Sequence, residues 1–309
     1  MVKKSNNKPE EHPGDVLQVW KVVGIFALVF TAVQLAIAAI GVGGKFLSDT
    51  ISAGANLHIF LFSTITRAAM VVAILLITMP VIRSVYRRRG LEGLYPIRRK
   101  QWKDVLSGIA IAAGAMAIVF ILTYALGFIT ITGFALSGQP FDAWLRAIWL
   151  ALLVNAVAAI GEEVLYRGLL LQGIEIAWDQ WGALFISSII FGGSHILVAG
   201  ANESNWLQFI PLLALPGIML GWAYLQTGNL WLATGIHFSW NLFQDDILNL
   251  TGFHRGETLF GLETTVNGPK WFVGTAYGIE VGAAGILCLL LVSVGICWWT
   301  RRAQQKTKV

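Results

Sequence analysis

The chain has 309 residues, of which 56% are hydrophobic and only 13% are charged. Its mean hydropathy of +0.68 argues against a water-soluble domain, because such domains carry about 25% charged residues. The net charge is +5, but most of the 22 lysines and arginines fall in three short patches outside the apolar runs, which argues against a nucleic-acid-binding protein. The two cysteines lie inside one apolar run, so neither a disulfide framework nor a cysteine metal site is expected.

Long apolar runs predict an all-α, polytopic integral membrane protein with about eight transmembrane helices. A run of about 20 residues is enough to cross a hydrocarbon core of about 30 Å. The expected spans are residues 20–43, 58–82, 104–134, 143–170, 181–199, 206–226, 229–250 and 274–299. We therefore expect a single helical domain over 20–299, between a polar tail at 1–19 and a basic tail at 300–309. No clear cleavage site follows the first apolar run, so this run is expected to be retained as a span.

The basic patches predict how the chain is oriented in the cell membrane. The segment 83–103, between the second and third spans, is rich in Lys and Arg, and short segments of this kind stay in the cytoplasm. Eight spans return the chain to its starting side, so both termini are expected to be cytoplasmic. The basic C-terminal tail agrees with this orientation, and both basic regions are expected to attract anionic lipid headgroups.

Three charged side chains interrupt the fourth expected span, in the stretch AVAAIGEEVLYRGLLLQG. A charge inside a span costs about 2.5–3.5 kcal/mol on insertion scales, so such residues usually face a protein interior or a hydrated site. Glu163 and Arg167 are one turn apart with the acid first, which favours an ion pair on one helix face. Glu162 lies about 100° further around the helix. An ion pair that only fixes packing would explain Glu163 and Arg167 but leaves Glu162 unexplained.

Two further spans carry histidines in a similar pattern. The stretch FGGSHI places Phe191 and His195 on one face of the fifth span, and HFSWN places His237 and Asn241 on one face of the seventh. At about 1.5 Å per residue, Glu162 and His195 both lie about 21 Å from the turn that joins their helices, so they can meet. A single histidine in a membrane helix is more often a packing residue. Three polar groups on three spans instead predict a shared site.

These residue types favour hydrolysis by an activated water molecule. A buried Glu162 beside His195 can act as a general base, and His237 with Asn241 can donate hydrogen bonds to a developing oxyanion. Glu162, His195 and His237 could equally bind zinc and leave one position for water. Ser194 is a poor candidate nucleophile, because adjacent residues on a helix point about 100° apart.

The motifs EEVLYR, FGGSH and HFSWN occur in one order within residues 145–242. This region resembles the CAAX prenyl protease type II and bacteriocin-processing family (CPBP, or Abi), with its motifs E-E-x-x-x-R, F-x-x-x-H and H-x-x-x-N. The resemblance implies an intramembrane endopeptidase in which Glu162 and His195 activate the attacking water. It implies that His237 and Asn241 form the oxyanion hole, or that His237 is a metal ligand.

The same resemblance implies that Glu163 and Arg167 organise the site. It leaves open whether the enzyme is glutamic or metal-dependent, with zinc as the possible cofactor. The substrate implied is a peptide or protein, either a prenylated C-a-a-X protein or a peptide precursor.

Two other functions fit the polar residues. In a transporter, Glu162, His195 and His237 together with Asp245 and Asp246 could relay protons or bind a cation near the bilayer midplane. In a non-enzymatic membrane adaptor, the polar cluster would only hold helices together. Cation flux without peptide cleavage would favour the transporter, and an unaffected Glu162→Gln variant would favour the adaptor.

Overall fold

The structure is a computed structural model, and it describes residues 18–51, 56–84, 94–95, 102–199, 210–250, 260–275 and 279–306. Most of the polar N-terminal tail and most of the basic segment 83–103 lie outside the described residues. The longer helices are α1 (Val19–Ile51), α2 (Asn56–Ser84), α4 (Trp102–Ala125), α5 (Phe141–Glu162), α7 (Gln180–Ala199), α8 (Ile210–Thr227), α9 (Trp231–Asn241) and α11 (Ala283–Lys306). The shorter elements are β1 (Ile129–Phe134), η1 (Glu163–Leu171), α6 (Gln172–Ala177), η3 (Leu242–Ile247), β2 (Leu262–Val266), α10 (Lys270–Val273) and η5 (Ile279–Val281).

The described chain is nearly all helical, as its apolar runs predict, and it has the helices of a multi-pass membrane protein. Among the described residues, five helices are long and apolar enough to cross a membrane: Val19–Phe46, Phe60–Ser84, Trp102–Ala125, Phe141–Ala177 and Ala283–Ala303. The expected number of eight spans is therefore not confirmed. Helices α7, α8 and α9 are not among these five, and α8 contributes only a shorter apolar helix, Leu212–Thr227.

The third expected span, residues 104–134, is too long at its C-terminal end. Helix α4 ends at Ala125, and Ile129–Phe134 instead forms strand β1, which pairs antiparallel with β2. Gly127 has a φ of +73°, a conformation that glycine adopts at little cost and that ends the helix. The β-branched residues that follow, in the sequence ITIT, suit a strand better than a helix. Apolar composition alone therefore concealed a change of secondary structure.

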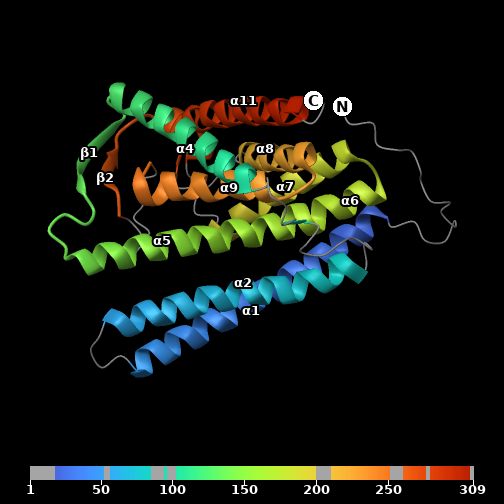
Figure 1. The fold of residues 1–309 in the computed structure, drawn as a ribbon, viewed down its shortest axis with the longest axis horizontal. Coiled ribbons are helices and arrows are strands. Elements are labelled where there is room, and N and C mark those ends of the chain that lie inside the picture. Colours follow the sequence, from blue (N-terminus) through green and yellow to red (C-terminus); the bar gives the residue numbers. More distant parts are fainter. Residues whose placement is uncertain are drawn as a thin grey trace.

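The helices pack in a way that places three of them around one point. In Figure 1, α1 and α2 run side by side along the lower edge of the molecule next to α5, while α4 and α11 lie on the opposite side. Helix α9 packs against both α4 and α5, and α7 packs against both α8 and η1. The helices α5–η1, α7 and α9, which contain the three sequence motifs, are therefore neighbours.

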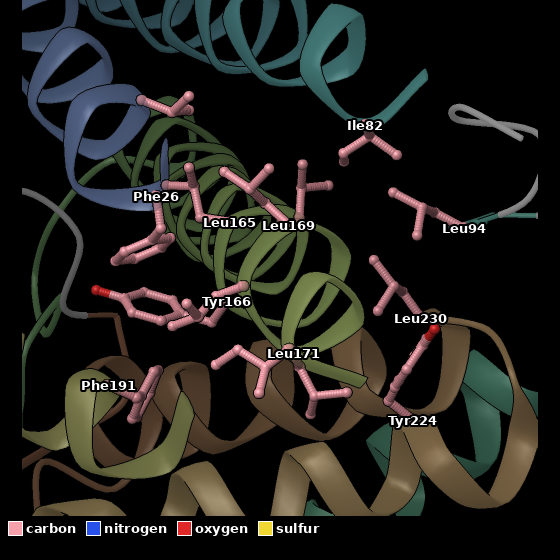
Figure 2. Packing of buried hydrophobic residues seen from close by; sticks show 14 of the residues in the cluster. Phe26, Ile82, Leu94, Leu165, Tyr166, Leu169, Leu171, Phe191, Tyr224 and Leu230 are labelled. Carbon is pink, nitrogen blue, oxygen red and sulfur yellow. The ribbon is translucent and has the colours of Figure 1, made fainter. Parts of the chain in front are cut away.

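Buried hydrophobic side chains form two clusters. The first lies mainly between α1, α2, η1 and α7, and Figure 2 shows Leu165 and Leu169 of η1 packed among Phe26, Ile82 and Leu94. The second lies between α4, α8, α9 and α11. Since η1 and α7 belong to the first cluster and α9 to the second, contacts between these helices join the two halves of the core.

The contact between α4 and α9 depends on two glycines. A Cβ added at Gly108 would lie 2.6 Å from the carbonyl oxygen of Leu232, and one added at Gly235 would collide with the carbonyl oxygen of Val105. Neither obstacle is a flexible side chain, so the two backbones can approach this closely only because both positions lack a side chain. The approach also fixes the height of α9, which contains His237.

We expect Gly235→Ala to lower the free energy of unfolding by about 1–3 kcal/mol, the usual cost of forcing extra volume into a packed interior. Thermal unfolding of the purified protein in detergent measures this effect. Gly114→Ala on α4 is the matched control, because a Cβ there meets nothing within 4 Å. Equal melting temperatures for the two variants would contradict the close-packing explanation.

Candidate functional site

The first motif lies on one continuous helix whose winding changes at the motif. Helix α5 ends at Glu162, and η1 continues it as a π-helix from Glu163 to Leu171 before α6 resumes the α-helical pattern. A π-helical turn is wider than an α-helical turn, and such segments occur often at functional sites. Glu162 and Glu163 therefore stand on either side of the point where the helix changes its winding.

Glu163 and Arg167 form a buried ion pair. Arg167 Nη1 donates to Glu163 Oε1 at 2.9 Å, and only 3% of the arginine side chain and none of the glutamate side chain is exposed. Arg167 Nη2 also donates to the carbonyl oxygen of Gly217 at 3.2 Å, and its guanidinium stacks over the ring of Phe191 at 4.7 Å. These contacts join η1 to both α8 and α7, so this arginine organises three helices.

His237 of α9 completes the buried part of the site. Its Nδ1 lies 2.9 Å from Glu163 Oε1, the same oxygen that Arg167 contacts. A carboxylate ion-paired to arginine can only accept hydrogen bonds, so His237 Nδ1 must donate. The other ring nitrogen, Nε2, lies 3.7 Å from Glu162 Oε2. One histidine therefore contacts both adjacent glutamates.

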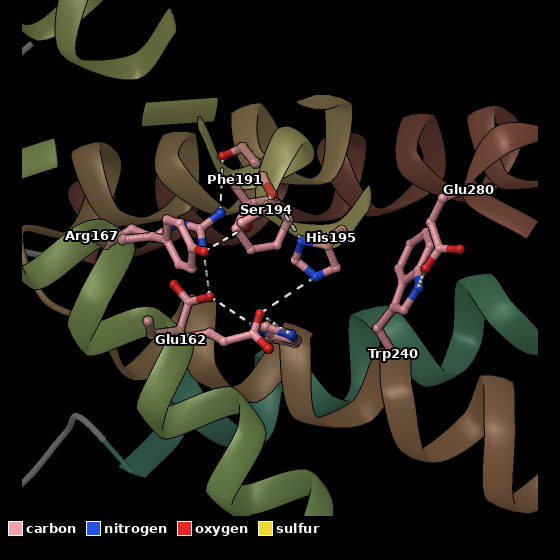
Figure 3. Close-up of polar contacts among 11 residues, drawn as sticks. Glu162, Arg167, Phe191, Ser194, His195, Trp240 and Glu280 are labelled. Carbon is pink, nitrogen blue, oxygen red and sulfur yellow. Dashed lines mark hydrogen bonds and ion pairs between the residues drawn. The ribbon is translucent and has the colours of Figure 1, made fainter. Parts of the chain in front are cut away.

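His195 of α7 approaches Glu162 from the other side. Its Nδ1 lies 2.8 Å from the carbonyl oxygen of Phe191, which can only accept, so Nδ1 is the donor here too. His195 Nε2 lies 3.7 Å from Glu162 Oε2, and Figure 3 shows the imidazole turned toward this carboxylate. The expected meeting of Glu162 and His195 is thus present in the structure.

Glu162 Oε2 is the centre of the arrangement. It lies 3.7 Å from Nε2 of both His195 and His237, which is too far for a direct hydrogen bond and suits a bridging water molecule. This oxygen is buried and has no hydrogen-bond partner among the described residues. The side chains of Glu162 and His195 are nevertheless 32% and 40% exposed, so a substrate can reach them from outside the protein.

Comparisons with known proteins give one match. Residues 143–243 match the family model described as type II CAAX prenyl endopeptidase Rce1-like. This segment is similar to that family. The match agrees with the resemblance that the three motifs carry, and its bounds are close to the expected 145–242. No curated protein and no solved structure matched the chain.

Within the Rce1-like segment, Asn241 is the residue least tied to the others. It is half-buried at the C-terminal end of α9, one turn after His237. None of the contacts that join the two glutamates, Arg167 and the two histidines involves it. Its expected part in the site therefore depends on its position one turn after His237.

The structure adds two contacts near the Rce1-like motifs that spacing does not reveal. Tyr166, inside the first motif, donates from its hydroxyl to Ser194 Oγ at 2.6 Å. Trp240 Nε1 donates to Glu280 Oε1 at 2.8 Å, and Figure 3 shows this pair on the far side of His195 from Glu162. Tyr166 could have been suspected from its place in the motif, whereas Glu280 lies outside the matched segment.

Asp245 and Asp246, which a transporter would use, lie in the π-helical segment η3. Both are buried, and Asp246 Oδ2 accepts a hydrogen bond of 2.6 Å from the side-chain amide of Asn155 on α5. This contact joins η3 to α5 and makes Asp246 part of the packing between these two helices.

A zinc ion bound by Glu162, His195 and His237 would fix the distances between the ligand atoms of these side chains. Ligands about 2.0–2.1 Å from a tetrahedral zinc ion lie about 3.3 Å from one another, whereas Glu162 Oε2 is 3.7 Å from each histidine nitrogen. Among the described residues, no group of three His, Cys, Asp or Glu side chains is arranged to hold a metal ion. These separations are longer than those of ligands around a bound zinc ion, and no step of the function proposed below passes through a metal.

Proposed function

We propose that the chain is a membrane-embedded endopeptidase in which Glu162 and His195 activate a water molecule that hydrolyses a peptide bond. The observation that supports this best is the convergence of Glu162 Oε2 with the Nε2 atoms of both His195 and His237, each at 3.7 Å. A water molecule between these atoms could donate one hydrogen bond to the Glu162 carboxylate and one to the unprotonated Nε2 of His195. Its oxygen lone pairs would then face an incoming carbonyl carbon.

In the proposed reaction, Glu162 accepts a proton as the water oxygen attacks the peptide carbonyl carbon. The tetrahedral intermediate carries its negative charge on the former carbonyl oxygen. When the C–N bond breaks, the proton passes from Glu162, through His195 or directly, to the leaving amine. The products are one carboxylic acid and one amine, and water is the only co-reactant.

His237 and Asn241 are proposed to stabilise the intermediate. His237 Nδ1 already donates to Glu163, so Nε2 can donate to an oxyanion only when both ring nitrogens carry protons. The Glu163 carboxylate on one side and Glu162 on the other favour that charged form. In this reading the buried pair of Glu163 and Arg167 acts by holding His237 in place.

The substrate is proposed to be the C-terminal region of a prenylated protein or a peptide precursor. The similarity to a family of CAAX prenyl endopeptidases supports the first of these. The apolar helices around the site support both, because either substrate would reach a membrane-embedded site from the lipid or its surface. We further infer that both termini are cytoplasmic, on the basis of the basic segments, and reporter fusions at each terminus test this orientation.

Cleavage of a peptide library by the purified full-length protein tests the proposed function. The library would contain farnesylated C-a-a-X peptides, the same peptides without the lipid, and unrelated internal sequences, with products identified by mass spectrometry. Cleavage at defined bonds supports the endopeptidase and also identifies the substrate class. Cation flux in sealed vesicles with no cleavage of any peptide would favour the transporter instead.

Activity is expected to survive removal of metal ions. We expect less than a twofold change in the rate of peptide cleavage after dialysis against EDTA, since the proposed water is held by Glu162 and His195 alone. Rates are measured before dialysis, after dialysis, and after zinc is added back. A loss of activity that zinc restores would contradict the glutamic mechanism and support the metal-dependent alternative with Glu162, His195 and His237 as ligands.

A further inference from the structure

A side-chain hydrogen bond joins the helix that contains Glu162 to the helix that contains His195. The hydroxyl group of Tyr166 on η1 donates to Ser194 Oγ on α7 at 2.6 Å. Tyr166 lies one turn after Glu162, and Ser194 immediately precedes His195. The bond therefore lies within one turn of Glu162 on one helix and one residue from His195 on the other.

Ser194 is fully occupied by this arrangement. Its Oγ accepts a hydrogen bond from the Tyr166 hydroxyl and donates one to the carbonyl oxygen of Phe191 at 2.7 Å. The same carbonyl oxygen accepts the Nδ1 proton of His195 at 2.8 Å. The serine hydroxyl and the imidazole thus share one anchor on α7, and the serine proton is not directed toward Glu162 or His237. These hydrogen bonds argue against Ser194 as the nucleophile.

The Tyr166 ring is held too firmly for its hydroxyl to move freely. The residue is only 3% exposed and packs edge-on against Phe191, with ring centroids 5.0 Å apart. On its other side it contacts Phe26 at 5.4 Å and Phe30 at 6.3 Å, both on α1. Since side chains in such packed surroundings occupy one rotamer, the hydroxyl group acts as a spacer of fixed length between η1 and α7.

We propose that Tyr166 and Ser194 are positioning residues that set the gap between Glu162 Oε2 and His195 Nε2. This inference rests on the proposed function, because the gap matters only if a water molecule is activated there. A gap of 3.7 Å admits a bridging water, whereas direct contact between the two groups would expel it and a wider gap would lose one of its two hydrogen bonds. A displacement of about 1 Å in such a site costs up to about 100-fold in rate.

Three variants test the spacer. Tyr166→Phe and Ser194→Ala each remove the bond while keeping most of the packing, and the double variant removes both partners. We expect each single variant to lower kcat for peptide cleavage about tenfold with KM unchanged, and the double variant to be no slower than the singles, because all three lose the same interaction. Tyr124→Phe, at an exposed position on α4, and Ser187→Ala, on α7, are the matched controls and should leave kcat unchanged.

A second measurement does not depend on activity. The chain has five histidines, so 15N spectra of protein labelled at the imidazole rings resolve His195, which a His195→Asn variant assigns. We expect Tyr166→Phe and Ser194→Ala to shift or broaden the His195 nitrogen signals and to leave those of His237 in place. If the His195 signals change in this way but the protein cleaves no peptide, the positioning role of Tyr166 and Ser194 is supported and the proposed hydrolase is rejected.

Two outcomes would overturn the inference. The first is that the variants melt at a lower temperature but keep the wild-type kcat and His195 signals, which would assign the bond to stability alone. The second is additive losses of kcat in the double variant, which would show that the two hydroxyl groups act separately.

Discussion

Replacing Glu162 with glutamine is expected to lower kcat for peptide hydrolysis by about 10²–10⁴-fold while the protein remains folded. The amide has nearly the same shape as the carboxylate but cannot accept a proton, and general-base catalysis contributes a factor of this size. The fold should tolerate the change, because Glu162 Oε2 has no hydrogen-bond partner among the described residues and the side chain is 32% exposed. Substrate binding should change little, since the loss affects the transition state more than the bound substrate.

Single-turnover cleavage of the best library peptide measures this effect, and the melting temperature in detergent checks that the variant is folded. Glu175→Gln on the same continuous helix is the matched control, because it makes the same chemical change away from the site. If Glu162→Gln keeps more than a tenth of the wild-type kcat, Glu162 is not the general base. If no biological function of the chain changes at all, the adaptor is the better reading.

The helices were predictable because apolar runs of membrane length leave few alternatives. The C-terminal end of the third expected span was not, because the residues of β1 are as apolar as those of a helix. What distinguishes them is the left-handed backbone at Gly127 and the pairing of Ile129 with Val266, a residue far along the chain. Pairing over such a sequence distance leaves no local pattern. The number of eight spans stays a prediction, since five of the described helices are long and apolar enough to cross a membrane.

The site was predictable to the extent that it depends on spacing along one helix. The intervals between Glu163 and Arg167 and between Phe191 and His195 indicated shared faces, and the contacts at these intervals are present in the structure. Contacts between helices were only partly accessible. Equal depth suggested that Glu162 meets His195, but nothing indicated that His237 contacts Glu163 as well as Glu162.

The π-helical winding of η1 also left no signal in the apolar pattern. All nine of its residues are buried, and Glu163 and Arg167 keep the four-residue spacing of an ordinary α-helix, so nothing in the sequence indicated a wider turn. The contact between Tyr166 and Ser194 was hidden for a different reason, since it joins residues of two motifs on two different helices. Motifs identify residues that share a helix face more readily than residues that join two helices.

Exposure separates the polar residues into two groups with different expected roles. Glu162 and His195 are partly exposed and are proposed to meet the substrate, whereas Glu163, Arg167 and His237 are almost completely buried. The buried group connects η1, α7, α8 and α9 around a single carboxylate. Substitutions in the two groups should therefore differ in kind, with those in the first lowering activity and those in the second lowering stability as well.

Arg167→Leu is expected to lower the free energy of unfolding by about 3–5 kcal/mol, the usual cost of removing one partner from a buried ion pair. The leucine leaves Glu163 the hydrogen bond from His237 but removes its ion pair, and it also removes the hydrogen bond to Gly217 and the stacking on Phe191. Arg167→Lys keeps the charge but not the planar fork that serves these contacts together, so it should restore only part of the stability.

The chain offers a close control for this variant in Arg146, which pairs with Asp142 at the same spacing near the start of α5. There the aspartate side chain is 63% exposed and water can replace the arginine, so Arg146→Leu should hardly change the melting temperature. Both variants are measured by thermal unfolding in one detergent at low and high salt. We attribute the importance of Arg167 to its burial and not to its pairing alone. Equal losses of melting temperature in Arg167→Leu and Arg146→Leu would therefore refute the claim that Arg167 holds the site together.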